Sequence, residues 1–128
     1  MRSPIHPTPT ELEILDVLWE RKKATVREVF EAINRRRPAQ YTTVLKLMQI
    51  MQEKGLVSRD EKEKAHVYRP AHSQRKTRTQ LVSSLLDKAF RGSALSLVQH
   101  VLEAKPASRE ELDAIREMID KAAGGAKK

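Results

Sequence analysis

The chain has 128 residues, of which 39% are hydrophobic, 4% aromatic and 33% charged, and its formal net charge is +8. A chain of this length can bury one modest core, mostly from aliphatic residues that suit helices. It contains no cysteine, which excludes disulfide scaffolds and thiol catalysis. The positive charge favours a polyanionic partner such as nucleic acid, although it could also serve solubility alone.

The sequence carries no signal for secretion or membrane insertion. Residues 1–9 lack the apolar segment of a signal peptide, and no run approaches the roughly 18 apolar residues of a membrane span. We therefore expect a cytoplasmic protein with no membrane insertion.

The first predicted helix begins after Thr8. The segment Thr8-Pro9-Thr10-Glu11 combines an N-cap threonine, a proline at the first helical position and a glutamate at the third. Apolar residues then recur at near-helical spacing as far as Arg21. This apolar set consists of Leu12, Leu15, Val17, Leu18 and Trp19.

Two further helices are predicted before residue 55. Thr25 and Glu28 repeat the capping-box pattern, and the apolar stripe that follows ends before the basic run Arg35-Arg36-Arg37 and Pro38. The third helix is expected from Tyr41 to Lys54, with Gly55 as a left-handed C-cap. Its apolar side contains Val44, Leu47, Met48 and Met51.

Residues 56–59 and 65–69 favour two short strands separated by a charged turn at residues 60–64, and Pro70 closes the second. Three short helices followed by a hairpin is the order of a winged helix-turn-helix, whose third helix enters the DNA major groove. We predict a mainly α fold with a small β-hairpin: a winged-helix domain over residues 1–72 and a helical dimerisation region over residues 73–128.

The C-terminal region predicts helices from Ser73 to about Arg91, from Ser93 to Ala104, and after an N-cap at Ser108, with fraying over residues 122–128. Three short helices leave apolar stripes uncovered, so we expect a second copy to cover them. Such a two-fold dimer would place two recognition helices about 34–36 Å apart. The predicted interface comprises Leu81, Leu85, Phe90, Leu95, Val98, Leu102, Leu112, Ile115 and Ile119.

The third helix predicts a DNA-contacting face opposite its apolar side. At 100° per residue, Thr42, Lys46 and Gln49 fall on that face, with Thr43 and Leu45 on the flanks. Lysine can contact guanine or phosphate, glutamine can pair with adenine, threonines can bind phosphates and leucine can touch a thymine methyl. An exposed polar face without a role is the alternative, which the three-helix-plus-hairpin order disfavours.

Cations outside this helix are candidate phosphate contacts. Arg35, Arg36 and Arg37 precede it directly, while Arg59, Lys62, Lys64 and Arg69 surround the hairpin. The Arg35–Arg37 run is the stronger of the two candidates, although either group could instead be a solvated basic segment. No catalytic grouping is present, because serines lack a nucleophile context and His6, His66, His72 and His100 lack metal-ligand spacing. We expect no enzyme activity, metal or cofactor.

Five segments together resemble the penicillinase-repressor (BlaI/MecI-type) family of transcriptional regulators. They are residues 11–19 (Glu-Leu-Glu-Ile-Leu-Asp-Val-Leu-Trp), 25–29, 41–45 (Tyr-Thr-Thr-Val-Leu), 53–57 and 66–70. The resemblance covers nearly the whole chain. It implies a winged helix, a C-terminal arm that interlocks with its twin, and a dimer bound to a palindromic operator that overlaps a promoter.

The chain departs from the family pattern at two positions of the third predicted helix. Family DNA contacts fall on positions matching Thr42, Thr43, Leu45 and Lys46, but staphylococcal-type repressors carry arginine where this chain has Leu45 and Ile50. The operator sequence therefore cannot be transferred.

Those repressors are inactivated by cleavage of an Asn-Phe bond, under control of a membrane sensor protease that detects β-lactams, and the bond aligns with His100-Val101. Copper-responsive relatives have a cysteine-rich tail, which this sequence lacks. Two alternatives stay open: a winged-helix module that binds an acidic protein, and a repressor that senses a small molecule.

Overall fold

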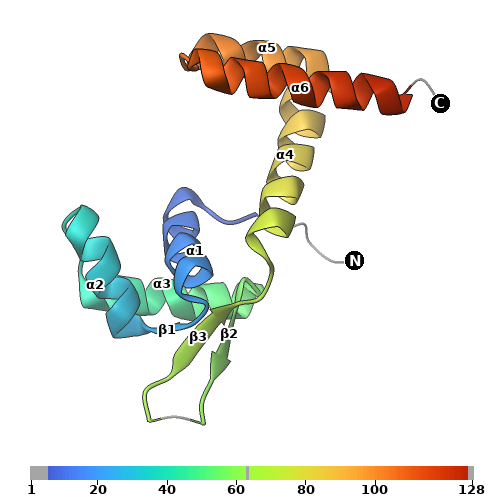
Figure 1. Ribbon diagram of the computed structural model, residues 1–128. Helices are drawn as coiled ribbons and strands as arrows, with labels where there is room; N and C mark the ends of the chain where they lie inside the picture. The colour runs from blue at the N-terminus through green and yellow to red at the C-terminus, as the bar shows by residue number, and fades with distance from the viewer. Residues whose placement is uncertain (1–5, 63, 127–128) are drawn as a thin grey trace. The chain divides into compact units, whose positions relative to one another are not determined.

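The computed structural model describes residues 6–62 and 64–126. The chain forms two compact units, Met1–Ser84 and Leu85–Lys128. The described residues form six helices and three strands, arranged as in Figure 1, so the predicted mainly helical fold with a small β element is confirmed. In chain order the elements are α1 (Pro9–Arg21), β1 (Ala24–Thr25), α2 (Val26–Arg36), α3 (Tyr41–Lys54), β2 (Val57–Asp60), β3 (Val67–Pro70), α4 (Gln74–Phe90), α5 (Ala94–Ala104) and α6 (Arg109–Ala126).

Capping boxes fix the starts of the first two helices where the sequence predicts them. The Thr8 hydroxyl accepts the Glu11 amide at 3.2 Å, and the Glu11 carboxylate accepts the Thr8 amide at 2.8 Å. Thr25 and Glu28 repeat the arrangement at 3.2 and 2.9 Å. Each box satisfies two backbone N–H groups that a helix start leaves without partners.

The third helix is bounded by backbone chemistry. It begins after Gln40, whose side chain makes no cap, and it ends at Gly55, whose φ of 81° is left-handed. The Gly55 amide donates to Gln52 O and the Leu56 amide donates to Met51 O, which satisfies carbonyls at the helix end. The predicted bounds and C-cap are confirmed.

The β element is a three-stranded antiparallel sheet of order β1-β3-β2, whereas the sequence predicts only a two-stranded hairpin. The added strand pairs Ala24 with Tyr68 and Thr25 with Val67. Thr25 therefore belongs to the sheet and also caps α2. In the pairing of β2 with β3, Val57 lies opposite Pro70, so the strand continues one residue beyond the predicted end at Arg69.

The core lies in the first unit, between the three N-terminal helices and the sheet. Its most buried side chains, exposed by 2% or less, include Ile14, Leu15, Leu18, Val29, Met48, Met51 and Tyr68. The indole Nε1 of Trp19 donates to the His72 carbonyl at 2.9 Å, and this bond ties α1 to the segment that leads into α4. The core thus holds α3 by one side only.

The second unit consists of helices without a core of their own. Ser93 and Ser108 accept from the amides of Ser96 and Glu111 and start the last two helices as predicted. None of the described residues from 85 to 125 is buried. Among the described residues, no helix is long and apolar enough to cross a membrane.

The structure differs from two predictions about the C-terminal region: the fraying of its end and the position of its boundary. Fraying over residues 122–128 is wrong for residues 122–126, which continue α6; Lys127 and Lys128 lie outside the described residues. Two glycines weaken a helix by about 1 kcal/mol each, and elongation of an existing helix tolerates this. The predicted domain boundary after residue 72 lies just before α4, whereas the two compact units divide within α4, between Ser84 and Leu85.

Candidate nucleic-acid interface

The α3 helix presents a polar face away from the core. Val44, Met48 and Met51 are at most 3% exposed, while Thr42, Thr43, Lys46 and Gln49 are exposed. Leu45 and Leu47 are partly buried against the core, so Leu45 lies between the two faces. We call Thr42, Thr43, Lys46 and Gln49 the α3 polar face.

The start of α3 is suited to an anion. Gln40 supplies no side-chain cap, so first-turn N–H groups are left for solvent or a ligand. The exposed hydroxyls of Thr42 and Thr43 lie in the same turn, where the helix dipole favours negative charge. This is the chemistry by which helix N-termini bind phosphate groups.

The hairpin places cations and carboxylates at one turn. Arg59 forms an ion pair with Glu61. Its hydrogen bond to Tyr68 raises the pKa of Arg59 above its ordinary value; burial opposes this rise, and Glu61 adds to it. The Lys62 amide donates to Asp60 Oδ1 at 2.9 Å and closes the turn. Arg59 is therefore held by contacts within the hairpin, to Glu61 in the turn and to Tyr68 in β3.

The side chains of Lys62, Lys64 and Arg69 are exposed. None of these three forms an ion pair within residues 6–62 and 64–126. They can therefore reach a phosphate backbone without first breaking a contact.

The Arg35–Arg37 run is turned in part toward α1. Arg37 donates to both carboxylate oxygens of Glu13, Nη2 to Oε1 at 2.5 Å and Nε to Oε2 at 3.4 Å. Arg36 helps line a depression of about 330 Å³ together with Asp16, Trp19, Glu20 and Gln74. Arg35 is exposed. In the described residues none of the three forms a hydrogen bond or ion pair with α3.

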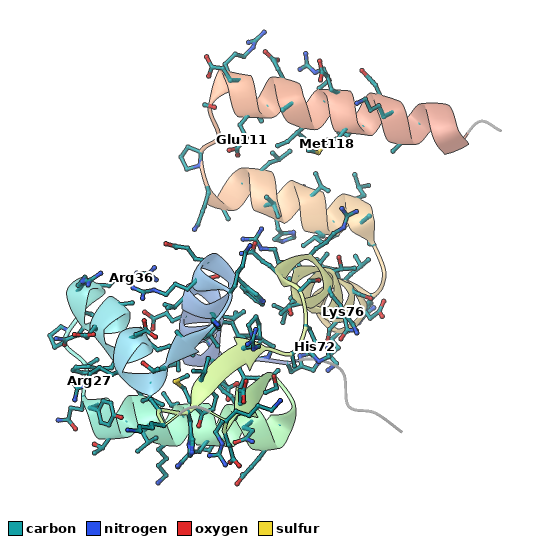
Figure 2. All side chains as sticks on the ribbon, turned by 60° about the horizontal axis from the view of Figure 1, so that its bottom comes forward. Arg27, Arg36, His72, Lys76, Glu111 and Met118 are labelled. Carbon is teal, nitrogen blue, oxygen red and sulfur yellow. The ribbon has the colours of Figure 1, made fainter. Side chains whose placement is uncertain are left out.

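An arginine that the sequence does not predict as a site residue lies beside the start of α3. The guanidinium carbon of Arg27 lies 5.1 Å from the centroid of the Tyr41 ring. That ring also meets Phe30 edge-on, with centroids 5.8 Å apart. Figure 2 shows Arg27 and Arg36 at opposite ends of α2. Only helix packing brings these residues together, so no local sequence signal marks them.

An ion pair between a buried carboxylate and a half-exposed lysine, also missed, joins the end of α3 to the start of α1. Lys54 Nζ lies 2.9 Å from Oε2 of Glu11, whose side chain is 2% exposed. Burial raises the pKa of Glu11, but the hydrogen bonds from Lys54 and Thr8 outweigh it, and the pKa is lowered from 4.5. The carboxylate thus fixes both helix ends in its charged form.

The predicted interface residues of the C-terminal helices lie on exposed or half-buried surface. Leu95 is 81% exposed, Ile119 56% and Leu85 48%. Large exposed apolar side chains are found only at Tyr41 and from Val82 to Ile119 within the described residues. The full predicted set spans α4, α5 and α6: Leu81, Leu85, Phe90, Leu95, Val98, Leu102, Leu112, Ile115 and Ile119.

The His100-Val101 bond lies inside α5, and both residues are exposed. The His100 ring packs edge-on against Phe90, with centroids 5.4 Å apart, and its Nδ1 lies 2.8 Å from Ser96 O. In the described part of the chain, no three histidine, aspartate or glutamate side chains gather as metal ligands.

Comparison with known proteins gives one consistent result. The family described as "Penicillinase repressor" matches residues 7–121. "Transcriptional regulator BlaI" of Mycobacterium tuberculosis is 35% identical over 115 residues, which are 85% of this chain and 79% of that protein. "Methicillin resistance regulatory protein MecI" is 22% identical over 111 residues in both Mammaliicoccus sciuri and Staphylococcus aureus, covering 87% of this chain and 90% of each relative.

Proposed function

Because the chain belongs to the penicillinase repressor family and is a transcriptional repressor of the BlaI and MecI type, we propose that it represses as a homodimer on a palindromic DNA operator. Each recognition helix enters one major groove, and the bound dimer covers the promoter. The relatives are named as regulators rather than enzymes, which agrees with a non-catalytic role.

The observation that carries this proposal is the exposed α3 polar face on a helix held from behind by the core. A rigid helix with its polar side free can enter a groove without rearrangement. Lys46 and Gln49 are the proposed base contacts, Leu45 meets a thymine methyl, and the threonines bind phosphate at the helix start.

Further cations supply affinity that does not depend on sequence. Lys62, Lys64 and Arg69 on the hairpin are proposed to follow the phosphate backbone. Arg59 contributes less, because Glu61 and Tyr68 already hold its guanidinium. Arg35 and Arg36 add a smaller contribution, and Arg37 contributes least because Glu13 already holds its guanidinium.

Dimerisation is proposed through the C-terminal helices. Their large apolar side chains are exposed, and covering one leucine stabilises an interface by roughly 1.5–3 kcal/mol. A second copy related by two-fold symmetry covers the same set twice.

Release of DNA is proposed to follow cleavage of the arm near His100-Val101 by a partner protease, which would separate part of the interface from the DNA-binding unit. A membrane-bound sensor protease is the proposed partner. The β-lactam signal is not transferred with it, because the bond differs from the Asn-Phe bond that the resemblance implies.

Selection of genomic DNA fragments by the full chain tests the function. We expect recovery of a palindromic sequence upstream of a gene, with affinity that falls steeply with salt. Sedimentation at micromolar concentration should give a dimer. Recovery of random fragments only, or a monomer under those conditions, would contradict the proposal. Release by a metabolite without chain cleavage would favour a ligand-sensing repressor instead.

A further inference from the structure

Arg27 lies in the first turn of α2 and is exposed, yet its guanidinium is not free in solvent. Its terminal carbon stands 5.1 Å from the centroid of the Tyr41 ring, a cation–π distance. Tyr41 is the first residue of α3 and directly precedes Thr42 and Thr43. The arginine therefore lies beside the N-terminal end of α3, where Thr42 and Thr43 are exposed. Figure 2 shows Arg27 next to that helix.

The acidic neighbours of Arg27 do not account for its position. Glu28 pairs with Arg21 at 3.8 Å and accepts the Thr25 amide at 2.9 Å. Glu31 lies one turn further along α2, a spacing that commonly forms ion pairs, but in the described residues it makes no ion pair with Arg27. A cation in the first turn of a helix also opposes the helix dipole. An anion from outside the chain would balance this charge.

The ring under Arg27 is itself held in place. Tyr41 meets Phe30 at 5.8 Å and an interplanar angle of 80°, and Phe30 packs against the core. An arginine held over the face of a fixed ring can still turn its planar N–H edge toward a phosphate, and that edge donates two parallel hydrogen bonds to it. Less side-chain freedom then has to be lost on binding.

We propose that Arg27 is a phosphate-binding residue of the DNA interface and that Tyr41 orients it for this contact. The inference rests on the proposed DNA-binding function and adds to it a residue of α2 that contacts the sugar-phosphate backbone beside the start of α3. Arg27 contributes affinity on every DNA sequence, whereas Lys46 and Gln49 contribute the preference among sequences.

The test uses the full chain, one genomic fragment that it selects, and a random duplex of equal length. Arg27→Ala should weaken binding to both duplexes by the same factor, roughly tenfold, and should reduce the salt dependence by about one phosphate contact. Arg27→Lys keeps the charge but loses the planar edge, so it should retain the salt dependence with reduced affinity.

Tyr41→Leu tests the orienting role. Without the ring, Arg27 loses its fixed position, so Arg27→Ala should cost less in the Tyr41→Leu background than in the unchanged chain. Additive losses would remove Tyr41 from the proposal. Circular dichroism melting of each variant checks that α3 remains folded.

Arg21→Ala is the matched control, since Arg21 is an exposed arginine paired with Glu28 and should leave both affinities unchanged. Unchanged affinity and salt dependence in a folded Arg27→Ala variant would overturn the inference, as would a loss confined to the selected fragment. If the unchanged chain binds neither duplex, the proposed function fails instead, so the two failures are distinguishable.

Discussion

Lys46 projects from the exposed side of α3, one helical turn after the first threonines of the α3 polar face. Replacing it with alanine should weaken binding to the selected operator by about 1–3 kcal/mol if the lysine contacts a base. If it contacts phosphate, the loss should be equal on operator and random duplexes. Fluorescence anisotropy titrations on both duplexes distinguish these results, with Lys23→Ala as an exposed-lysine control. Wild-type affinity on every duplex would remove Lys46 from the interface.

Glu11 joins two helix ends through one buried carboxylate. Its glutamine variant keeps the shape but replaces the buried carboxylate, which accepts from Lys54 Nζ and the Thr8 amide, with a neutral amide. The free energy of unfolding at pH 7 should therefore fall by about 1–2 kcal/mol. Urea unfolding measures the loss. Glu31→Gln, at an exposed glutamate of α2, should leave the free energy of unfolding unchanged.

The same residue predicts a pH dependence. Folding lowers the pKa of Glu11 from 4.5, so the unfolded chain binds the proton more readily in the interval below that value. The stabilisation is therefore fully present above pH 4.5 and is lost as the pH falls through the folded-state pKa. The stability difference between the unchanged chain and Glu11→Gln should shrink in acid. A difference that stayed constant from pH 7 to pH 3 would contradict the assignment.

Among the elements, α3 depends on a single backbone conformation at its end. Gly55 has a φ of 81°, and a Cβ built there meets nothing within 4 Å. Gly55→Ala should therefore cost only the left-handed strain, roughly 1–2 kcal/mol, measured by denaturant unfolding. Gly124 carries no left-handed φ and has equal space around it, so Gly124→Ala should not destabilise the chain. Equal stability of Gly55→Ala and the unchanged protein would refute this explanation.

Local signals explain which elements the sequence could predict. The capping boxes at Thr8 and Thr25, and the glycine after Lys54, act through residues at most five positions apart, and the three corresponding helix bounds are confirmed. β1 was missed because its two residues become a strand only by pairing with β3 more than 40 positions later. Burial of Glu11 was missed because Lys54, equally distant, makes it possible.

The residues of the candidate site also fall into those that local sequence signals predict and those that they do not. Helical periodicity predicts which side of α3 is polar, and the structure places those residues on the exposed side. Periodicity cannot show that Arg37 turns back to Glu13 or that Arg27 reaches Tyr41, since both contacts depend on how α2 packs against its neighbours. Whether these side chains bind DNA stays a prediction.

In the intact protein, affinity for DNA should depend on the C-terminal helices. Leu95 is 81% exposed in the single chain, so Leu95→Lys should not unfold it. In a two-fold interface the change acts twice, which amounts to about 3–6 kcal/mol or more than a hundredfold in dimer dissociation. Sedimentation should give monomers at micromolar concentration, and binding to a two-half-site operator should weaken.

Ala104→Lys is the matched control for Leu95→Lys. Ala104 is an exposed residue on the opposite side of α5, so the variant adds the same charge and should remain dimeric. A dimer of unchanged strength in Leu95→Lys would exclude Leu95 from the interface. Thermal unfolding of both variants verifies that the N-terminal unit is intact.

Thr25 couples the unfolding of the hairpin to that of the helix-turn-helix. Its backbone pairs with Val67 in the sheet, while its hydroxyl accepts the Glu28 amide at 3.2 Å, so β1 cannot detach without disturbing the first turn of α2. In native-state hydrogen exchange, the amides of β3 and of that turn should exchange through the same cooperative opening, with equal free energies of opening. The hairpin would then not behave as an independently mobile flap, and its distance from α3 would stay constant.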